Sequence, residues 1–152
     1  MTKVLLDTTY LLPLAGIQVR GVQTDAFKTI RARGHEVFIS DISLFEILAK
    51  GAKLVAEGRA DERRVTAAVE ALLNEETIRR VSAYDVDVGR VAIALRPYHS
   101  DFIDCLILAS SLEECETLVT EEVAFARNEA LMEFVRMRKP TFRISSLRRL
   151  LA

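Results

Sequence analysis

The chain has 152 residues, half of them hydrophobic, which is enough to bury the core of a single domain, expected to span residues 1–152. Its 21 basic and 22 acidic residues give a formal net charge of −1, which excludes a protein that binds nucleic acid through overall positive charge. No apolar run approaches the roughly 20 residues of a membrane span, and Asp7 interrupts the apolar start, so we expect neither a membrane segment nor a signal peptide.

Short apolar runs alternate with helical patterns in the first half of the chain. Residues 3–6 and 37–39 are apolar runs typical of strands buried on both faces. Helical spacing of apolar residues predicts helices over residues 25–33, 43–57 and 61–74. Ser43 and Glu46 form a capping-box pattern, which by itself explains Glu46 as a helix-capping residue.

The same alternation continues to the end of the chain. Strands are predicted at residues 78–81, 117–119 and 142–144, the first of them near a sheet edge. Helices are predicted at residues 85–95, from about residue 101 through an apolar stretch, at 126–137 and, capped by Ser145, at 147–151. Strands alternating with helices indicate βα units around a parallel sheet, so the predicted fold class is α/β.

The positions of the two cysteines and two histidines argue against a disulfide and against a zinc site. Cys105 and Cys115 lie ten positions apart on one expected helix, or ~15 Å at the helical rise, which is beyond disulfide reach. They predict buried thiols in a reducing cytoplasm. His35 and His99 lack zinc-site spacing, and His99 is expected to form hydrogen bonds before a helix rather than to bind metal.

Acidic residues stand where the predicted strands end and the helices begin. Asp7 follows the first strand, Asp101 and Asp104 open the apolar helix three residues apart, and Glu122 follows the strand at 117–119. Each has an ordinary alternative explanation as a turn or capping residue, although capping explains Asp104 poorly, because it is followed by a buried apolar run.

Parallel strands would bring these carboxylates, together with Glu46, to one edge of the sheet. Several carboxylates in one place repel one another and cannot all remain ionised without a cation. Carboxylate and water oxygens are the ligands that Mg²⁺ and Mn²⁺ prefer. The sequence therefore predicts an acidic divalent-metal site of the kind that activates water toward a phosphodiester.

Four blocks in order resemble the PIN-domain nucleases, and especially the VapC-type toxins of prokaryotic toxin–antitoxin pairs. They are V-L-L-D-T-T, S-L-F-E-I-L, D-F-I-D-C-L-I-L-A-S-S-L and L-V-T-E-E-V-A-F. The resemblance implies a three-layer αβα sandwich around a parallel sheet of four to five strands. The fourth block departs from the usual Thr-x-Asp of the family, because Glu122 stands at the expected aspartate.

The resemblance also implies a metal-dependent endoribonuclease that hydrolyses RNA. The catalytic residues carried over by position are Asp7, Glu46 and Asp104, with Asp101 and Glu122 as further metal ligands for Mg²⁺ or Mn²⁺. Thr8 and Thr120 are expected to support them by hydrogen bonding. Implied partners are an RNA substrate, a VapB-type antitoxin and a second copy of the chain, with no membrane and a cytoplasmic location.

Other functions compatible with the sequence are a PIN-like module that binds RNA or protein without cleaving it and an RNA-processing nuclease without an antitoxin. A phosphatase with an aspartyl nucleophile ranks last, because Asp7-Thr8-Thr9 lacks a second aspartate two positions on. The C-terminal end is the most basic part of the chain. It is expected to be solvated surface, and it is also the best candidate for contact with an RNA backbone or an acidic partner: Arg136, Arg138, Lys139, Arg143, Arg148 and Arg149.

Overall fold

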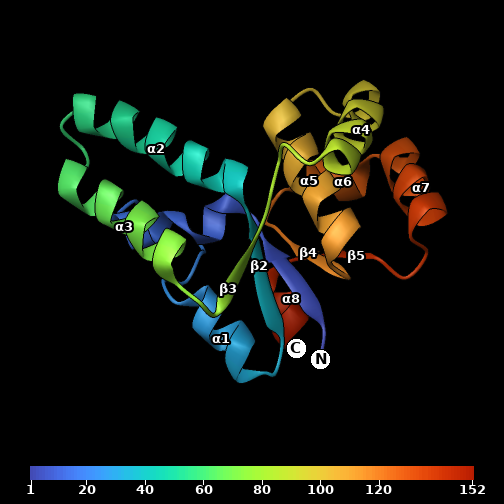
Figure 1. Ribbon diagram of the computed structural model, residues 1–152, viewed down its shortest axis with the longest axis horizontal. Helices are drawn as coiled ribbons and strands as arrows, with labels where there is room; N and C mark the ends of the chain where they lie inside the picture. The colour runs from blue at the N-terminus through green and yellow to red at the C-terminus, as the bar shows by residue number, and fades with distance from the viewer.

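A parallel sheet runs through the centre of the molecule in the computed structural model, which describes residues 1–152 (Figure 1). Its five strands lie in the order β3-β2-β1-β4-β5, and every neighbouring pair is parallel. They are β1 (Lys3–Leu6), β2 (Glu36–Ser40), β3 (Ile78–Val81), β4 (Thr117–Val119) and β5 (Arg143–Ser145). The predicted sheet is therefore confirmed, with β3 at an edge and β5 one residue later than expected.

Helices cover both faces of this sheet. On one face lie η1 (Thr8–Tyr10), η2 (Leu12–Ala15), α1 (Ala26–Ala32), α2 (Asp41–Ala56), α3 (Glu62–Asn74) and α8 (Leu147–Leu151). On the other lie α4 (Val86–Leu95), η3 (Arg96–Tyr98), α5 (Phe102–Glu114), α6 (Ala124–Arg127) and α7 (Glu129–Arg138). In Figure 1, α2 and α3 stand to the left of the strands and α4 to α7 to the right, and the two separate cores confirm the predicted three-layer α/β sandwich.

The central strand β1 shows why the chain forms three layers. Val4 and Leu6 enter one hydrophobic core, whereas Leu5, between them, enters the other, because successive side chains of a strand point to opposite faces. All three are fully buried. An unbroken apolar run is what a strand covered on both faces requires.

Some element boundaries differ from the sequence prediction. Helix α2 begins at Asp41 rather than Ser43, because the Ser40 hydroxyl already caps it by accepting a hydrogen bond from the Ile42 N–H. The helix expected over residues 126–137 is two helices, since Asn128 interrupts it and caps α7. Ser146, not Ser145, caps α8.

Helices α2 and α3 form an antiparallel arm that extends to one side of the sheet (Figure 1). The two helices pack closely at Gly51, where a Cβ added to the glycine would lie 2.4 Å from a methyl carbon of Val65 in α3. None of the helices has the length and apolar character needed to span a membrane.

Both cysteines are free and buried, as predicted. Burial raises the pKa of the Cys105 thiol to about 11 and also raises the pKa of Cys115. Neither group is therefore a nucleophile near neutral pH.

Candidate functional site

A polar cavity of about 350 Å³ opens at the carboxyl ends of β1 and β4, between the starts of α2 and α5. No hydrophobic residue lines it. All five acids singled out from the sequence contribute to its wall, although they are up to 115 positions apart. The lining consists of Asp7, Thr8, Thr9, Glu46, Lys50, Asp101, Asp104, Glu121 and Glu122.

Asp7 is held firmly between two neighbouring strands. Its carboxylate accepts hydrogen bonds from the Thr8 N–H at 2.7 Å and from the Thr120 hydroxyl at 2.6 Å. Burial nevertheless raises the pKa of Asp7 from its ordinary 3.8 to about 6, against those two bonds, and the charges of Asp104 and Glu46 raise it further. A carboxylate that is oriented by donors and still resists ionisation is one that a cation would stabilise.

The Thr8 hydroxyl connects the end of β1 to helix α2. Thr8 Oγ1 lies 2.6 Å from Glu46 Oε1 and 2.8 Å from Ser43 Oγ, and Thr8 is almost fully buried. With one proton on each hydroxyl, Thr8 donates to the carboxylate and Ser43 donates to Thr8. Glu46 is thus not the capping residue that the Ser43–Glu46 pattern suggested. It lies in the second turn of α2, because the helix begins earlier.

Replacing Thr8 with Val keeps the shape and removes both hydrogen bonds. We expect the free energy of unfolding to fall by about 1–3 kcal/mol, because the buried Ser43 hydroxyl and the Glu46 carboxylate lose their partner. Denaturant unfolding measures this. Thr9→Val is the matched control, since the Thr9 hydroxyl makes no hydrogen bond within the protein, and a loss as large in Thr9→Val would contradict the role given to Thr8.

Asp101 and Asp104 have different roles at the start of α5. Asp101 is the N-cap, and its Oδ1 accepts hydrogen bonds from the Ile103 and Asp104 N–H groups at 2.9 and 3.3 Å. Asp104, in the first turn, lies with its Oδ2 2.8 Å from His99 Nε2. Burial raises the pKa of Asp104, with the His99 hydrogen bond acting in the opposite direction. The prediction that His99 forms hydrogen bonds is confirmed, and its partner is an acid of the cavity.

Thr120 connects Glu122, which follows β4, to Asp7. Its hydroxyl accepts a hydrogen bond from the Glu122 N–H at 2.9 Å while donating to Asp7. The Glu122 carboxylate accepts from the Ala124 N–H at 2.9 Å, at the start of α6. These bonds place Glu122 on the cavity wall with one carboxylate oxygen already engaged.

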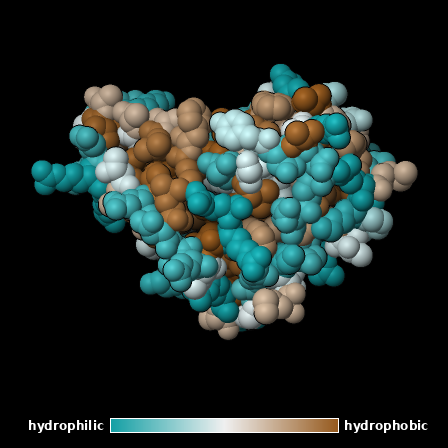
Figure 2. Space-filling model, in the orientation of Figure 1, coloured by the Kyte–Doolittle hydropathy of each residue, from teal (hydrophilic) through white to brown (hydrophobic).

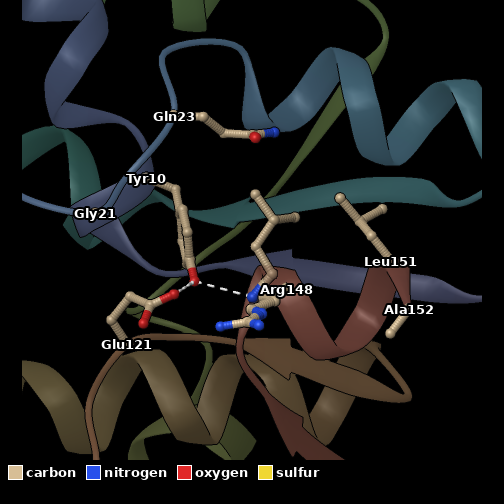
Figure 3. A pocket seen from close by; sticks show the side chains of 8 residues that line it. Tyr10, Gly21, Gln23, Glu121, Arg148, Leu151 and Ala152 are labelled. Atoms are coloured by element: carbon tan, nitrogen blue, oxygen red, sulfur yellow. Dashed lines mark hydrogen bonds between the residues drawn. The ribbon is translucent and has the colours of Figure 1, made fainter.

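Glu121 is held by Tyr10, a buried residue at the end of η1. The Tyr10 hydroxyl donates to the Glu121 carboxylate and accepts a hydrogen bond from the Leu147 N–H at 3.1 Å (Figure 3). Burial is the main cause that raises the pKa of Tyr10, and its bond to Glu121 adds to it. Glu121 lines the acidic cavity and also a neighbouring pocket formed with α8, which Figure 3 shows.

Two residues of this site, Glu121 and Lys50, were not predicted from the sequence. Nothing in the sequence connects Glu121 to Tyr10, which lies 111 positions away in the chain. Lys50 had a usable signal, because a lysine four residues after Glu46 on a helix is placed to pair with it. Lys50 Nζ lies 3.8 Å from Glu46 Oε2 and is the one positive charge lining the cavity.

The donor set suits a hard divalent cation, but the side chains do not form a complete cage. No three His, Cys, Asp or Glu side chains are grouped as a metal site. Mg²⁺ keeps several of its waters and is held by one or two carboxylates in most proteins, so a complete cage is not required. A purely polar cavity lined by carboxylates has the oxygen donors and the space for such a hydrated ion.

The chain matches the PIN domain family over residues 4–131. No curated protein sequence matches it. Among solved structures it is similar to VapBC2 from Rickettsia felis bound to a promoter DNA fragment, at 15% identity and a TM-score of 0.60, over 95% of this chain and 98% of that one. It is also similar to FitAcB from Neisseria gonorrhoeae, at 16% identity and a TM-score of 0.56, over 95% and 97%.

A third similar structure is a toxin–antitoxin complex from Klebsiella pneumoniae. The identity is 25% and the TM-score 0.53, over 81% of this chain and 90% of that one. At identities of 15 and 16%, the likeness to the other two structures establishes a shared fold.

Proposed function

Because the chain belongs to the PIN domain family, whose members are generally nucleases, we propose that it is a divalent-metal-dependent endoribonuclease. The observation that carries this proposal is the polar cavity in which Asp7, Glu46 and Asp104 meet at the carboxyl ends of the strands. The raised pKa of Asp7 supports it, because burial and, to a smaller extent, the charges of Asp104 and Glu46 disfavour an ionised Asp7, and a bound cation would offset both effects.

In this proposal Asp7, Glu46 and Asp104 hold Mg²⁺ or Mn²⁺, and Asp101 and Glu122 contribute through water or through their remaining free oxygen. The bound cation would lower the pKa of a water molecule and stabilise the charge that develops on the phosphodiester. The hydrogen-bonding side chains of the site keep the carboxylates in position before the substrate arrives: Thr120 on Asp7, Thr8 on Glu46, and His99 on Asp104. Cleavage by activated water leaves a 3′-hydroxyl and a 5′-phosphate.

The proposal predicts that cleavage of a labelled single-stranded RNA depends on Mg²⁺ or Mn²⁺. EDTA should stop the reaction and fresh metal should restore it, as followed on a denaturing gel. Asp104→Asn, purified in parallel, should be inactive with metal, which excludes a contaminating ribonuclease. Equal cleavage by both proteins, or cleavage that persists in EDTA, would refute the proposal. RNA binding without cleavage would instead indicate a non-catalytic PIN-like module, unless Glu122→Asp restored activity.

We propose that the protein is the toxin of a toxin–antitoxin pair rather than an RNA-processing nuclease that has no antitoxin. The α2–α3 arm carries an apolar groove of about 330 Å³, lined in part by Leu48, Ala52 and Val55. Phe45 and Leu48 beside it are 56% and 43% exposed, and Figure 2 shows apolar surface over this arm. An apolar face of this kind fits an amphipathic helix from a partner, and the similar solved structures include toxin–antitoxin complexes.

A second exposed apolar face lies on α4. Val86 and Ile93, two helical turns apart, are 65% and 67% exposed, and Phe102 at the start of α5 is also exposed. Residues at this spacing share one side of a helix. We propose that this face forms a homodimer, and that the protein acts in the cytoplasm, where its two cysteines stay reduced.

A further inference from the structure

Another cavity, of mixed polar and apolar lining, adjoins the acidic one at the carboxyl ends of β4 and β5. Its volume is about 280 Å³, and it shares Glu121 and Glu122 with the acidic cavity. Its remaining wall includes Arg127 at the end of α6 and Arg149 in α8. The two cavities are therefore neighbours, separated by Glu121 and Glu122, and the second one adds two arginines beside the acidic wall.

The two arginines of this second cavity have no partner in the protein. Neither guanidinium pairs with a carboxylate within 4.0 Å, and neither donates a hydrogen bond. Arginines on the nearby α7 behave differently, because Arg136 pairs with Glu133 and Arg138 pairs with Glu113. Two unpaired positive charges thus stand beside the acidic site.

The fold, rather than the local sequence, brings these two charges together. Arg127 follows β4 and Arg149 follows β5, and the parallel pairing of β4 with β5 places both segments at the same edge of the sheet. Two like charges facing one cavity repel, and an anion between them removes that repulsion. The Ser146 hydroxyl accepts the Arg149 N–H at 3.3 Å and keeps its own proton for donation.

We propose that Arg127 and Arg149 bind a backbone phosphate of the nucleic-acid strand next to the bond held at the acidic cavity. The planar guanidinium matches a phosphate with two parallel hydrogen bonds, which is why arginine suits this role. A strand entering a wall of carboxylates is repelled, and a positive subsite directly beside it offsets that repulsion and sets where the strand lies. This inference rests on the proposed nuclease function and assigns the part of the substrate that the second cavity holds.

The test measures RNA binding without cleavage. The full chain is titrated in EDTA against a short fluorescent single-stranded RNA, and anisotropy gives the dissociation constant over a series of salt concentrations. We expect the double variant Arg127→Ala/Arg149→Ala to bind about tenfold more weakly or worse, because charged hydrogen bonds are lost. The slope of log K against log salt should fall by about 0.7, the value for one phosphate contact on a single strand.

Arg63→Ala is the matched control. Arg63 begins α3 at the outer turn of the α2–α3 arm, is exposed, forms no ion pair and lines neither cavity. Its affinity and salt slope should equal those of the wild type. The variant Arg127→Lys/Arg149→Lys retains the charge, and we expect it to regain the salt slope but only part of the affinity, because lysine lacks the planar fork. Thermal melting checks that all variants fold.

The outcomes separate this inference from the proposed function. Unchanged affinity and slope in the double alanine variant, with RNA bound by the wild type, would overturn the arginine subsite and leave the nuclease proposal standing. An equal loss in Arg63→Ala would mean that total charge matters rather than this cavity, and would also overturn it. A wild-type chain that does not bind RNA in EDTA would overturn the arginine subsite, and one that also fails to cleave RNA with added metal would overturn both proposals.

Discussion

Replacing Asp7 with Asn is expected to abolish RNA cleavage while making the metal-free chain more stable at neutral pH. Loss of a direct metal ligand should lower the rate by at least about 100-fold, the upper range for residues that only support a ligand. The stability gain follows from the pKa of Asp7, which burial raises from 3.8 to about 6. That difference corresponds to up to about 3 kcal/mol of destabilisation when the group is ionised.

The direction of the pH dependence follows from the same pKa. The folded chain binds the Asp7 proton more tightly than the unfolded chain, so Asp7 costs no stability below about pH 4 and its full cost is reached above pH 6. The advantage of Asp7→Asn should therefore be absent below about pH 4, grow between about pH 4 and 6, and level off above pH 6. Denaturant unfolding in EDTA at several pH values measures this.

Asp85→Asn is the control for that experiment. It makes the same change in charge at the N-cap of α4, outside the acidic cavity, where the Asp85 carboxylate caps two backbone N–H groups. Asparagine caps a helix about as well as aspartate, so activity and stability should both change little. An active Asp7→Asn variant, or a stability gain that does not depend on pH, would show that Asp7 is not the charged centre of this cavity.

Mn²⁺ or Mg²⁺ is expected to raise the melting temperature of the wild-type chain. A ligand at 100 times its dissociation constant stabilises the folded state by about 2.7 kcal/mol. For a domain of this length each kcal/mol is worth roughly 2–4 °C, so the shift should be roughly 5–10 °C. Differential scanning fluorimetry with and without metal measures it.

The same experiment on variants assigns the shift to the cavity. Asp104→Asn and Glu46→Gln should lose most of it, because each removes a carboxylate from the polar wall, whereas Asp85→Asn should keep it. Each variant is compared with itself before and after metal addition, since relief of repulsion alone changes the starting temperature. An undiminished shift in Asp104→Asn would place the ion elsewhere.

Most of the fold could be predicted from the sequence because its signals are local. The apolar runs at β1 and β2 require burial on both faces, and the alternation of such runs with amphipathic helices restricts the connections to parallel βα units. The meeting of Asp7 with Asp104 at one edge follows from that topology. Boundaries were less secure where two capping residues compete, as Ser40 and Ser43 do at α2.

The roles of single side chains in the site were harder to predict because they depend on contacts between distant segments. The sequence pattern makes Glu46 a capping residue. Because α2 begins earlier, at Asp41, Glu46 instead accepts a hydrogen bond from Thr8, 38 positions away in the chain. Glu121 gained a fixed position from Tyr10, whose own hydroxyl is anchored by the backbone of α8.

The sequence by itself determined the α/β class, the order of the elements and the set of acids that follow strands or begin helices. The reason is that hydrophobic periodicity, and the acids at the ends of each element, can be recognised in short stretches of the chain. Only the tertiary structure decided which oxygen of each acid is already engaged and that Arg127 and Arg149 line one cavity. Those features depend on strand pairing and helix rotation, which act between residues tens of positions apart and leave no pattern along the chain.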